Sequence, residues 1–209
     1  DNTFASPINQ NPADFGIDIM LHSATKYMGG HSDISAGAIA ASEDYIAKIW
    51  KTAINYGGNL SDQTVWLLER SMKTLNLRVK EQTKNAQIMA EYLEKSEHID
   101  AVYYPGLPSH PYHKIAKKQM SGFGGMVSFR LKEDTFEASS KLMTAFKIFK
   151  IADSLGGVES MSNLPMIMTH GAMKEEERQR LGVTPGLIRL SVGIENIEDI
   201  LEDFNQALK

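Results

Sequence analysis

The chain has 209 residues, of which 42% are hydrophobic and 23% charged, so it can bury the core of one large or two small domains. Its 22 basic and 26 acidic side chains give a net charge of −4, without the basic footprint of nucleic-acid binding. The absence of cysteine excludes disulfides, thiolate catalysis and sulfur-ligated zinc, and it favours a cytoplasmic protein. No apolar run reaches the roughly 18 residues of a membrane span, so no membrane partner is expected.

The first part of the chain alternates short strands with helices. Residues 17–21 are predicted to form a buried strand, which a turn follows at residues 23–26. Small apolar residues at 34–41 predict the next strand. A helix is predicted at residues 44–56, and Gly57-Gly58 ends it. This alternation is typical of an α/β domain.

A long helical segment follows and is predicted to join two lobes. Ser61 or Asp62 can cap its start, and apolar residues recur at helical spacing to about Glu94. We expect the division inside this segment, so that residues 1–80 belong to the first domain and residues 81–209 to the second.

The pattern of strands and helices in the second part of the chain predicts a smaller α+β domain. Strands are expected at residues 101–104, 125–131 and 187–192, the middle one with a clear period of two. The last helix places apolar residues of 197–208 on one face and acidic residues on the other.

The run His22-Ser23-Ala24-Thr25-Lys26 is the strongest candidate for chemistry. An amine that forms a Schiff base with a phosphorylated aldehyde needs hydroxyls nearby, because they can hold the phosphate oxygens. Ser23 and Thr25 lie at suitable spacing from Lys26. Hydroxyl-rich turns are common, however, so the motif needs support from other positions.

Three further positions each allow two interpretations. Arg189 lies in an apolar strand, where it is either solvated at a sheet edge or a clamp for a substrate carboxylate. Asp1 is either a cap or surface charge, or a carboxylate that keeps a pyridine nitrogen protonated. The turn at Ser154 ends in Gly156-Gly157, which is either ordinary or allows the backbone to approach a ligand closely.

Taken together, several runs resemble the Cys/Met metabolism family of pyridoxal-phosphate (PLP) enzymes. The runs are Asp1-Asn-Thr-Phe-Ala, Ser23-Ala-Thr-Lys-Tyr-Met-Gly-Gly-His31-Ser-Asp, Tyr104-Pro-Gly-Leu-Pro-Ser-His-Pro111, Ser154-Leu-Gly-Gly-Val-Glu-Ser160, Met168-Thr-His170 and Ile188-Arg-Leu-Ser-Val-Gly-Ile-Glu195. This family includes cystathionine γ-synthase, cystathionine β- and γ-lyases, methionine γ-lyase and the homoserine sulfhydrylases. The resemblance extends in consistent order along the whole chain.

The resemblance implies a role for each candidate. Lys26 would be the Schiff-base lysine, and Asp1 would pair with the pyridine nitrogen of pyridoxal 5'-phosphate. Ser23 and Thr25 would contact the cofactor, chiefly its phosphate. The substrate carboxylate would be held by two further residues, Arg189 and Ser154.

The resemblance also implies an architecture. The fold would be aspartate-aminotransferase-like (fold type I), with part of a large, mostly parallel cofactor domain and a smaller C-terminal α+β domain. Members are usually homotetramers. They carry about as many residues again before this Asp1, so the chain is expected to be the C-terminal half of an enzyme and to need the missing half as a partner.

Asp153 bears on the substrate. An acid before the Ser-Leu pair resembles members that handle cystathionine, whose distal ammonium needs a counter-charge, although Asp153 is otherwise an ordinary turn cap. We therefore expect a C–S lyase acting on cystathionine. A γ-synthase or O-acylhomoserine sulfhydrylase, then a methionine γ-lyase, are the alternatives, and an inactive oligomerisation fragment is the non-enzymatic one.

Overall fold

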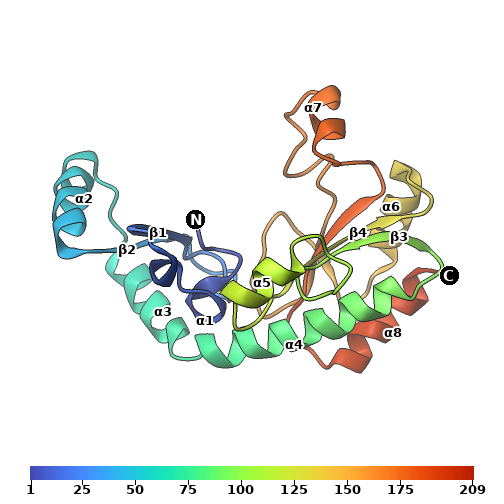
Figure 1. Cartoon of the computed structure of the whole chain (residues 1–209), viewed down its shortest axis with the longest axis horizontal. Helices are drawn as coiled ribbons and strands as arrows, with labels where there is room; N and C mark the ends of the chain where they lie inside the picture. Colours follow the sequence, from blue (N-terminus) through green and yellow to red (C-terminus); the bar gives the residue numbers. More distant parts are fainter.

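The computed structural model describes residues 1–209 and shows a mixed α/β chain with two separate sheets (Figure 1). In chain order the elements are α1 (Ser6–Asn9), the 3-10 helix η1 (Pro12–Phe15), β1 (Ile19–Ser23), β2 (Gly37–Ala41), α2 (Glu43–Tyr56), α3 (Asp62–Met72), α4 (Leu75–Glu94), β3 (Ile99–Tyr103), α5 (His113–Gln119), β4 (Met126–Leu131), α6 (Phe136–Ala145), β5 (Lys150–Ile151), β6 (Met161–Asn163), α7 (Glu175–Arg180), β7 (Leu187–Ser191) and α8 (Ile197–Ala207). No helix has the length and apolarity needed to cross a bilayer.

The first sheet consists of β1 and β2 alone. The two strands run antiparallel, with Ile19 opposite Ala41 and Ser23 opposite Gly37. The expected buried strand at 17–21 is wrong in two respects, because β1 is displaced by two residues and its Ile19 and Leu21 are 36% and 44% exposed. The elements of this chain cover that face only in part. The mostly parallel sheet that the resemblance implied is not found among these two strands either.

The long helical segment is divided into two helices. Ser61 caps α3 as expected, since its side chain accepts a hydrogen bond from the backbone N–H of Thr64 at 3.2 Å. The chain turns at Lys73 and Thr74, and α4 then extends along the lower edge of the molecule under both lobes (Figure 1). One helix therefore contacts both halves of the chain.

The second sheet has five strands in the order β3-β4-β7-β6-β5. All neighbours are antiparallel except β5 and β6. Side chains of alternate residues along β7 point to opposite faces, so Ile188 and Leu190 enter the core while Arg189 points to the other face. Helices α4, α6 and α8 cover the core face, where for example Phe204 packs edge-on against Phe129.

Two hydrophobic clusters meet along α4. Leu75 and Val79 pack with the turn that follows β1, whereas Met89 and Leu93 pack under the five-stranded sheet. Leu155 of the second half joins the first cluster, so the halves share a packed boundary. We propose that the domains divide near residue 80, where α4 passes from one cluster to the other.

Candidate active site

The turn that carries Lys26 is ordered by hydrogen bonds to its own backbone and to Ala36, the residue before β2. Its amides form helix-like bonds, among them Gly30 N–H to the carbonyl of Lys26 at 2.7 Å. The Thr25 hydroxyl accepts a bond from Ala36 N–H at 2.9 Å and donates to the Ala36 carbonyl at 3.3 Å. The Thr25 side chain thus ties the turn to the chain that leads into β2, which the sequence did not indicate.

Arg78 of α4 supports the same turn from below. Its guanidinium donates to the carbonyls of Tyr27 at 2.7 Å, Met28 at 3.2 Å and Ser71 at 2.9 Å. Arg78 is buried, and this burial lowers its pKa from the usual value. Gly30 makes the arrangement possible, because it has a φ of +70° and a Cβ there would lie 1.9 Å from the Arg78 guanidinium.

The turn at Ser154 packs directly on the lysine turn. Gly156 has a φ of +77°, and a Cβ on it would lie 2.8 Å from the backbone nitrogen of Tyr27. The close approach expected of this glycine is therefore to protein backbone, not to a ligand. Val158 N–H also donates to the Gly30 carbonyl at 2.9 Å. As a result the Lys26 Nζ donates to the Ser154 Oγ at 3.0 Å, across 128 positions of sequence.

Arg189 lies near the centre of the second sheet. Its strand β7 runs between β4 and β6, and its register partners are Ser128 and Asn163. The alternative of a solvated arginine at a sheet edge is therefore wrong. The guanidinium donates to the Ser154 carbonyl at 3.3 Å. Burial lowers the pKa of Arg189, and the charge of Asp153 acts in the opposite direction.

Asp153 is exposed beside this arginine. One carboxylate oxygen accepts a hydrogen bond from the Asn163 side chain at 3.1 Å. No backbone N–H donates to the carboxylate, so Asp153 does not cap its turn. Its second oxygen is available to a cation.

Asp1 and Ser23 are linked to the lysine turn less directly. The Asp1 carboxylate accepts from Thr3 N–H, and the Thr3 hydroxyl accepts from Ser23 N–H, both at 2.8 Å. Asp1 lines two cavities of about 420 and 460 Å³, neither of which is lined by Lys26 or Arg189. Hydrogen bonds join Lys26, Ser154 and Arg189 directly, whereas Asp1 reaches the turn that carries Lys26 only through Thr3 and Ser23. The 420 Å³ cavity does reach Ser128, the neighbour of Arg189 in the sheet.

Several of the groups that pyridoxal phosphate would need for binding have few or no hydrogen-bond partners within the chain. Lys26 Nζ has only a serine hydroxyl as partner, and the Ser23 hydroxyl and one Asp1 carboxylate oxygen have none. Thr25 fits less well, because its hydroxyl already bonds Ala36. An amine, a hydroxyl and a carboxylate are the groups that hold an aldehyde, a phosphate and a pyridinium.

Comparison with known proteins identifies the family of the chain. The family description "Cys/Met metabolism PLP-dependent enzyme" matches residues 1–209. The chain belongs to this family. It is 49% identical over its whole length to a cystathionine β-lyase of Lactococcus lactis subsp. cremoris, of which it covers 55%. It is also 47% identical to a cystathionine γ-lyase of Dictyostelium discoideum, of which it covers 54%.

A solved structure supports the fold. The crystal structure of a cystathionine γ-lyase from Micromonospora echinospora matches the whole chain with a TM-score of 0.95 at 40% identity. The chain covers 55% of that structure, and so spans about half the length of the relatives it matches. Membership of the family implies the aspartate-aminotransferase-like fold, of which this chain contains a mixed α/β portion.

Three supporting residues were missed by sequence reasoning. Arg78, Gln82 and Asn85 are buried on α4 together with its apolar residues. The sequence did contain a signal for them, because they lie at helical spacing from the apolar residues of α4 and therefore on its buried face. Tyr27 was also missed as a contact, although its buried hydroxyl accepts from Gly125 N–H at 3.2 Å and burial raises its pKa.

Proposed function

We propose that this chain supplies the catalytic lysine and the carboxylate-binding arginine of a PLP-dependent C–S lyase that acts on cystathionine. One observation carries the proposal. Ser154 contacts both residues, through its hydroxyl to Lys26 Nζ at 3.0 Å and through its carbonyl to Arg189 at 3.3 Å. An amino acid held by its carboxylate at Arg189 would therefore present its Cα to the Lys26 amine.

Each residue has a defined task in the proposed reaction. Pyridoxal phosphate, when bound, supplies an electron sink that makes the Cα–H bond of an attached amino acid acidic. Lys26 Nζ would take up that proton and return one later, and the Ser154 hydroxyl would direct the amine during the transfer. Arg189 would bind the α-carboxylate, and its planar guanidinium suits a two-point contact.

Asp153 supports cystathionine as the substrate. Cystathionine carries a second ammonium group beyond its sulfur, and a carboxylate near the site can bind that group. The free oxygen of Asp153, exposed beside Arg189, has this character. A methionine γ-lyase would gain nothing from an acid here, because methionine has no distal charge. Synthase and sulfhydrylase activities remain the runner-up proposals, because they use the same lysine and arginine.

The proposal extends to the assembled protein. We propose that the chain acts as part of a longer polypeptide that forms a homotetramer. The exposed apolar side chains on α2 and α3, with Trp50 and Trp66 each about 60% exposed, support burial against further protein. The same surface would serve an inactive oligomerisation fragment, so chemistry at Lys26 has to decide between the two.

The deciding experiment is chemical trapping in the complete protein. Borohydride reduction followed by peptide mass spectrometry should find the pyridoxyl group on Lys26 alone. Lys26→Ala should lose the label and lower cystathionine turnover by at least about a thousandfold. An unmodified Lys26, or a variant with full turnover, would reject the enzymatic role. Release of pyruvate would then indicate β-cleavage and release of 2-oxobutyrate γ-cleavage.

A further inference from the structure

The polar side chains buried along α4 form a row. Arg78, Gln82 and Asn85 are separated by four and three residues, a spacing that puts them on one side of a helix. They are 5%, 0% and 0% exposed. Burying a polar side chain is unfavourable unless it gains hydrogen bonds, so these residues need partners.

Each of the three residues donates to the backbone of a different site segment. Arg78 bonds the carbonyls of Tyr27 and Met28, directly after Lys26. Gln82 donates to the carbonyl of Gly157 at 2.7 Å, three residues after Ser154.

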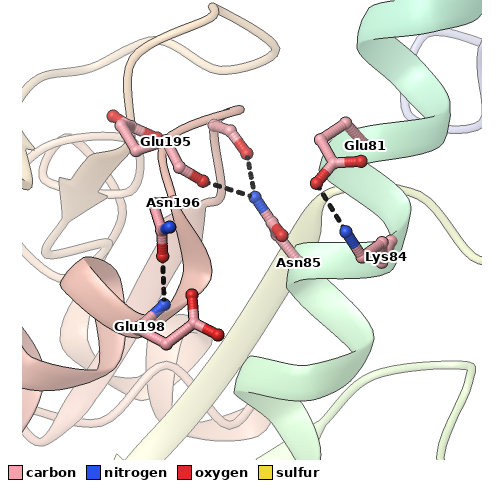
Figure 2. A network of polar contacts seen from close by, with 7 residues as sticks. Glu81, Lys84, Asn85, Glu195, Asn196 and Glu198 are labelled. Atoms are coloured by element: carbon pink, nitrogen blue, oxygen red, sulfur yellow. Dashed lines mark hydrogen bonds and ion pairs between the residues drawn. The ribbon is translucent and has the colours of Figure 1, made fainter.

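Asn85 completes the row. It donates to the carbonyls of Gly193 at 3.2 Å and Glu195 at 2.9 Å, which follow the strand of Arg189 (Figure 2). The carbonyls of the site segments that the three residues bind lie 50 to 110 positions away in sequence. No local motif brings these segments together.

An α-helix is stiff, with a rise of about 1.5 Å per residue, so the row sets fixed anchor points about 10 Å from end to end. We propose that Arg78, Gln82 and Asn85 are positioning residues, which hold the segments of Lys26, Ser154 and Arg189 at their working separation. This inference rests on the proposed function, because it concerns the same lysine and arginine.

Gln82 offers the sharpest test. Its amide nitrogen is the donor to the Gly157 carbonyl, while its Oε1 atom is buried without a partner. The side chain therefore contributes one hydrogen bond and its volume. Methionine has a similar length and volume but no donor, so Gln82→Met separates positioning from packing.

The first measurement is the reactivity of Lys26. In the complete protein, prepared without cofactor, the rate of reductive methylation at Lys26 is followed by peptide mass spectrometry. Gln82→Met should raise this rate about threefold to tenfold, the factor that one lost hydrogen bond predicts, because Ser154 no longer retains the amine. Gln87→Met is the matched control, since Gln87 bonds only Glu91 of the same helix, at 2.7 Å. It should leave the rate unchanged.

Further variants test whether Gln82 affects the reactivity of Lys26 through Ser154. Ser154→Ala should raise the Lys26 rate to a similar extent, and the double variant with Gln82→Met should raise it no further, because both act through one contact. Gln82→His keeps an N–H donor of similar reach and should restore the original rate. Independent, additive effects would overturn the proposal, as would equal rates in Gln82→Met and Gln87→Met.

Folding is checked by circular dichroism. If Gln82→Met did not fold, the proposal would also be overturned, because the bond would then serve the stability of the whole chain. None of these measurements uses substrate or bound cofactor. A negative result would thus be separate from failure of the borohydride test at Lys26.

Discussion

Replacement of Gly156 by alanine tests how closely the two turns of the site are packed. A Cβ at this position would lie 2.8 Å from the Tyr27 nitrogen and 3.1 Å from the Lys26 carbonyl carbon. Ordinary contacts begin near 3.5 Å, so one of the two turns has to move by about 0.7 Å. Such a shift would lengthen the 3.0 Å contact between Lys26 and Ser154 beyond hydrogen-bond range.

The expected cost has two parts. Alanine at a positive φ loses about 1–2 kcal/mol, and the backbone clash adds about 1–3 kcal/mol. Gly182→Ala is the matched control, because Gly182 has a φ of +73° but no atom within 4 Å of the added Cβ. The difference in unfolding free energy between the two variants therefore measures the cost of the clash alone. Displacing Ser154 should also lower turnover by roughly tenfold to a hundredfold in Gly156→Ala, and not in Gly182→Ala.

Urea unfolding measures the stability of both variants in the complete protein, and a cystathionine assay measures kcat. Equal losses of unfolding free energy would refute the contact between the turns. Unchanged turnover in a folded Gly156→Ala protein would refute the need for Ser154 to lie at Lys26.

Two other predictions concern charge. Arg189→Lys should raise KM for cystathionine by roughly tenfold or more with a smaller change in kcat, because a lysine lacks the two-point contact with a carboxylate; a fall in kcat alone would contradict carboxylate binding. Burial lowers the pKa of His22 below 6.5. The unfolded chain then binds this proton more readily, so the contribution to stability is complete above pH 6.5 and is lost as the pH falls through the lowered pKa. The unfolding free energy of His22→Gln should fall less between about pH 7 and pH 5 than that of the unsubstituted protein. An equal fall in both proteins would show that another group causes the pH dependence.

Much of the secondary structure was predictable from local patterns. The last helix and the strand at 126–131 follow directly from periods of 3.6 and 2 residues. The break at Thr74 was not predictable, because the apolar spacing continues across it. The burial of β1 was wrongly expected, since an apolar strand can be covered only in part by the elements of its own chain.

The candidate site was predictable in its residues and not in its contacts. Lys26, Ser154 and Arg189 were each identified from their surroundings, but their mutual contacts depend on β7 lying inside the sheet. Asp1 reaches the turn that carries Lys26 only through Thr3 and Ser23, a path of hydrogen bonds that local spacing does not reveal. The functional role of each residue remains a proposal that the experiments above address.

By itself the sequence determined the family, the periodic elements and the candidates for the reactive side chains, because these depend on residue type and local spacing. Only the tertiary structure decided that Gly156 packs against the lysine turn and that Gln82 supports the serine turn. Such contacts join residues more than 70 positions apart, so they depend on how the helix and sheet pack in three dimensions.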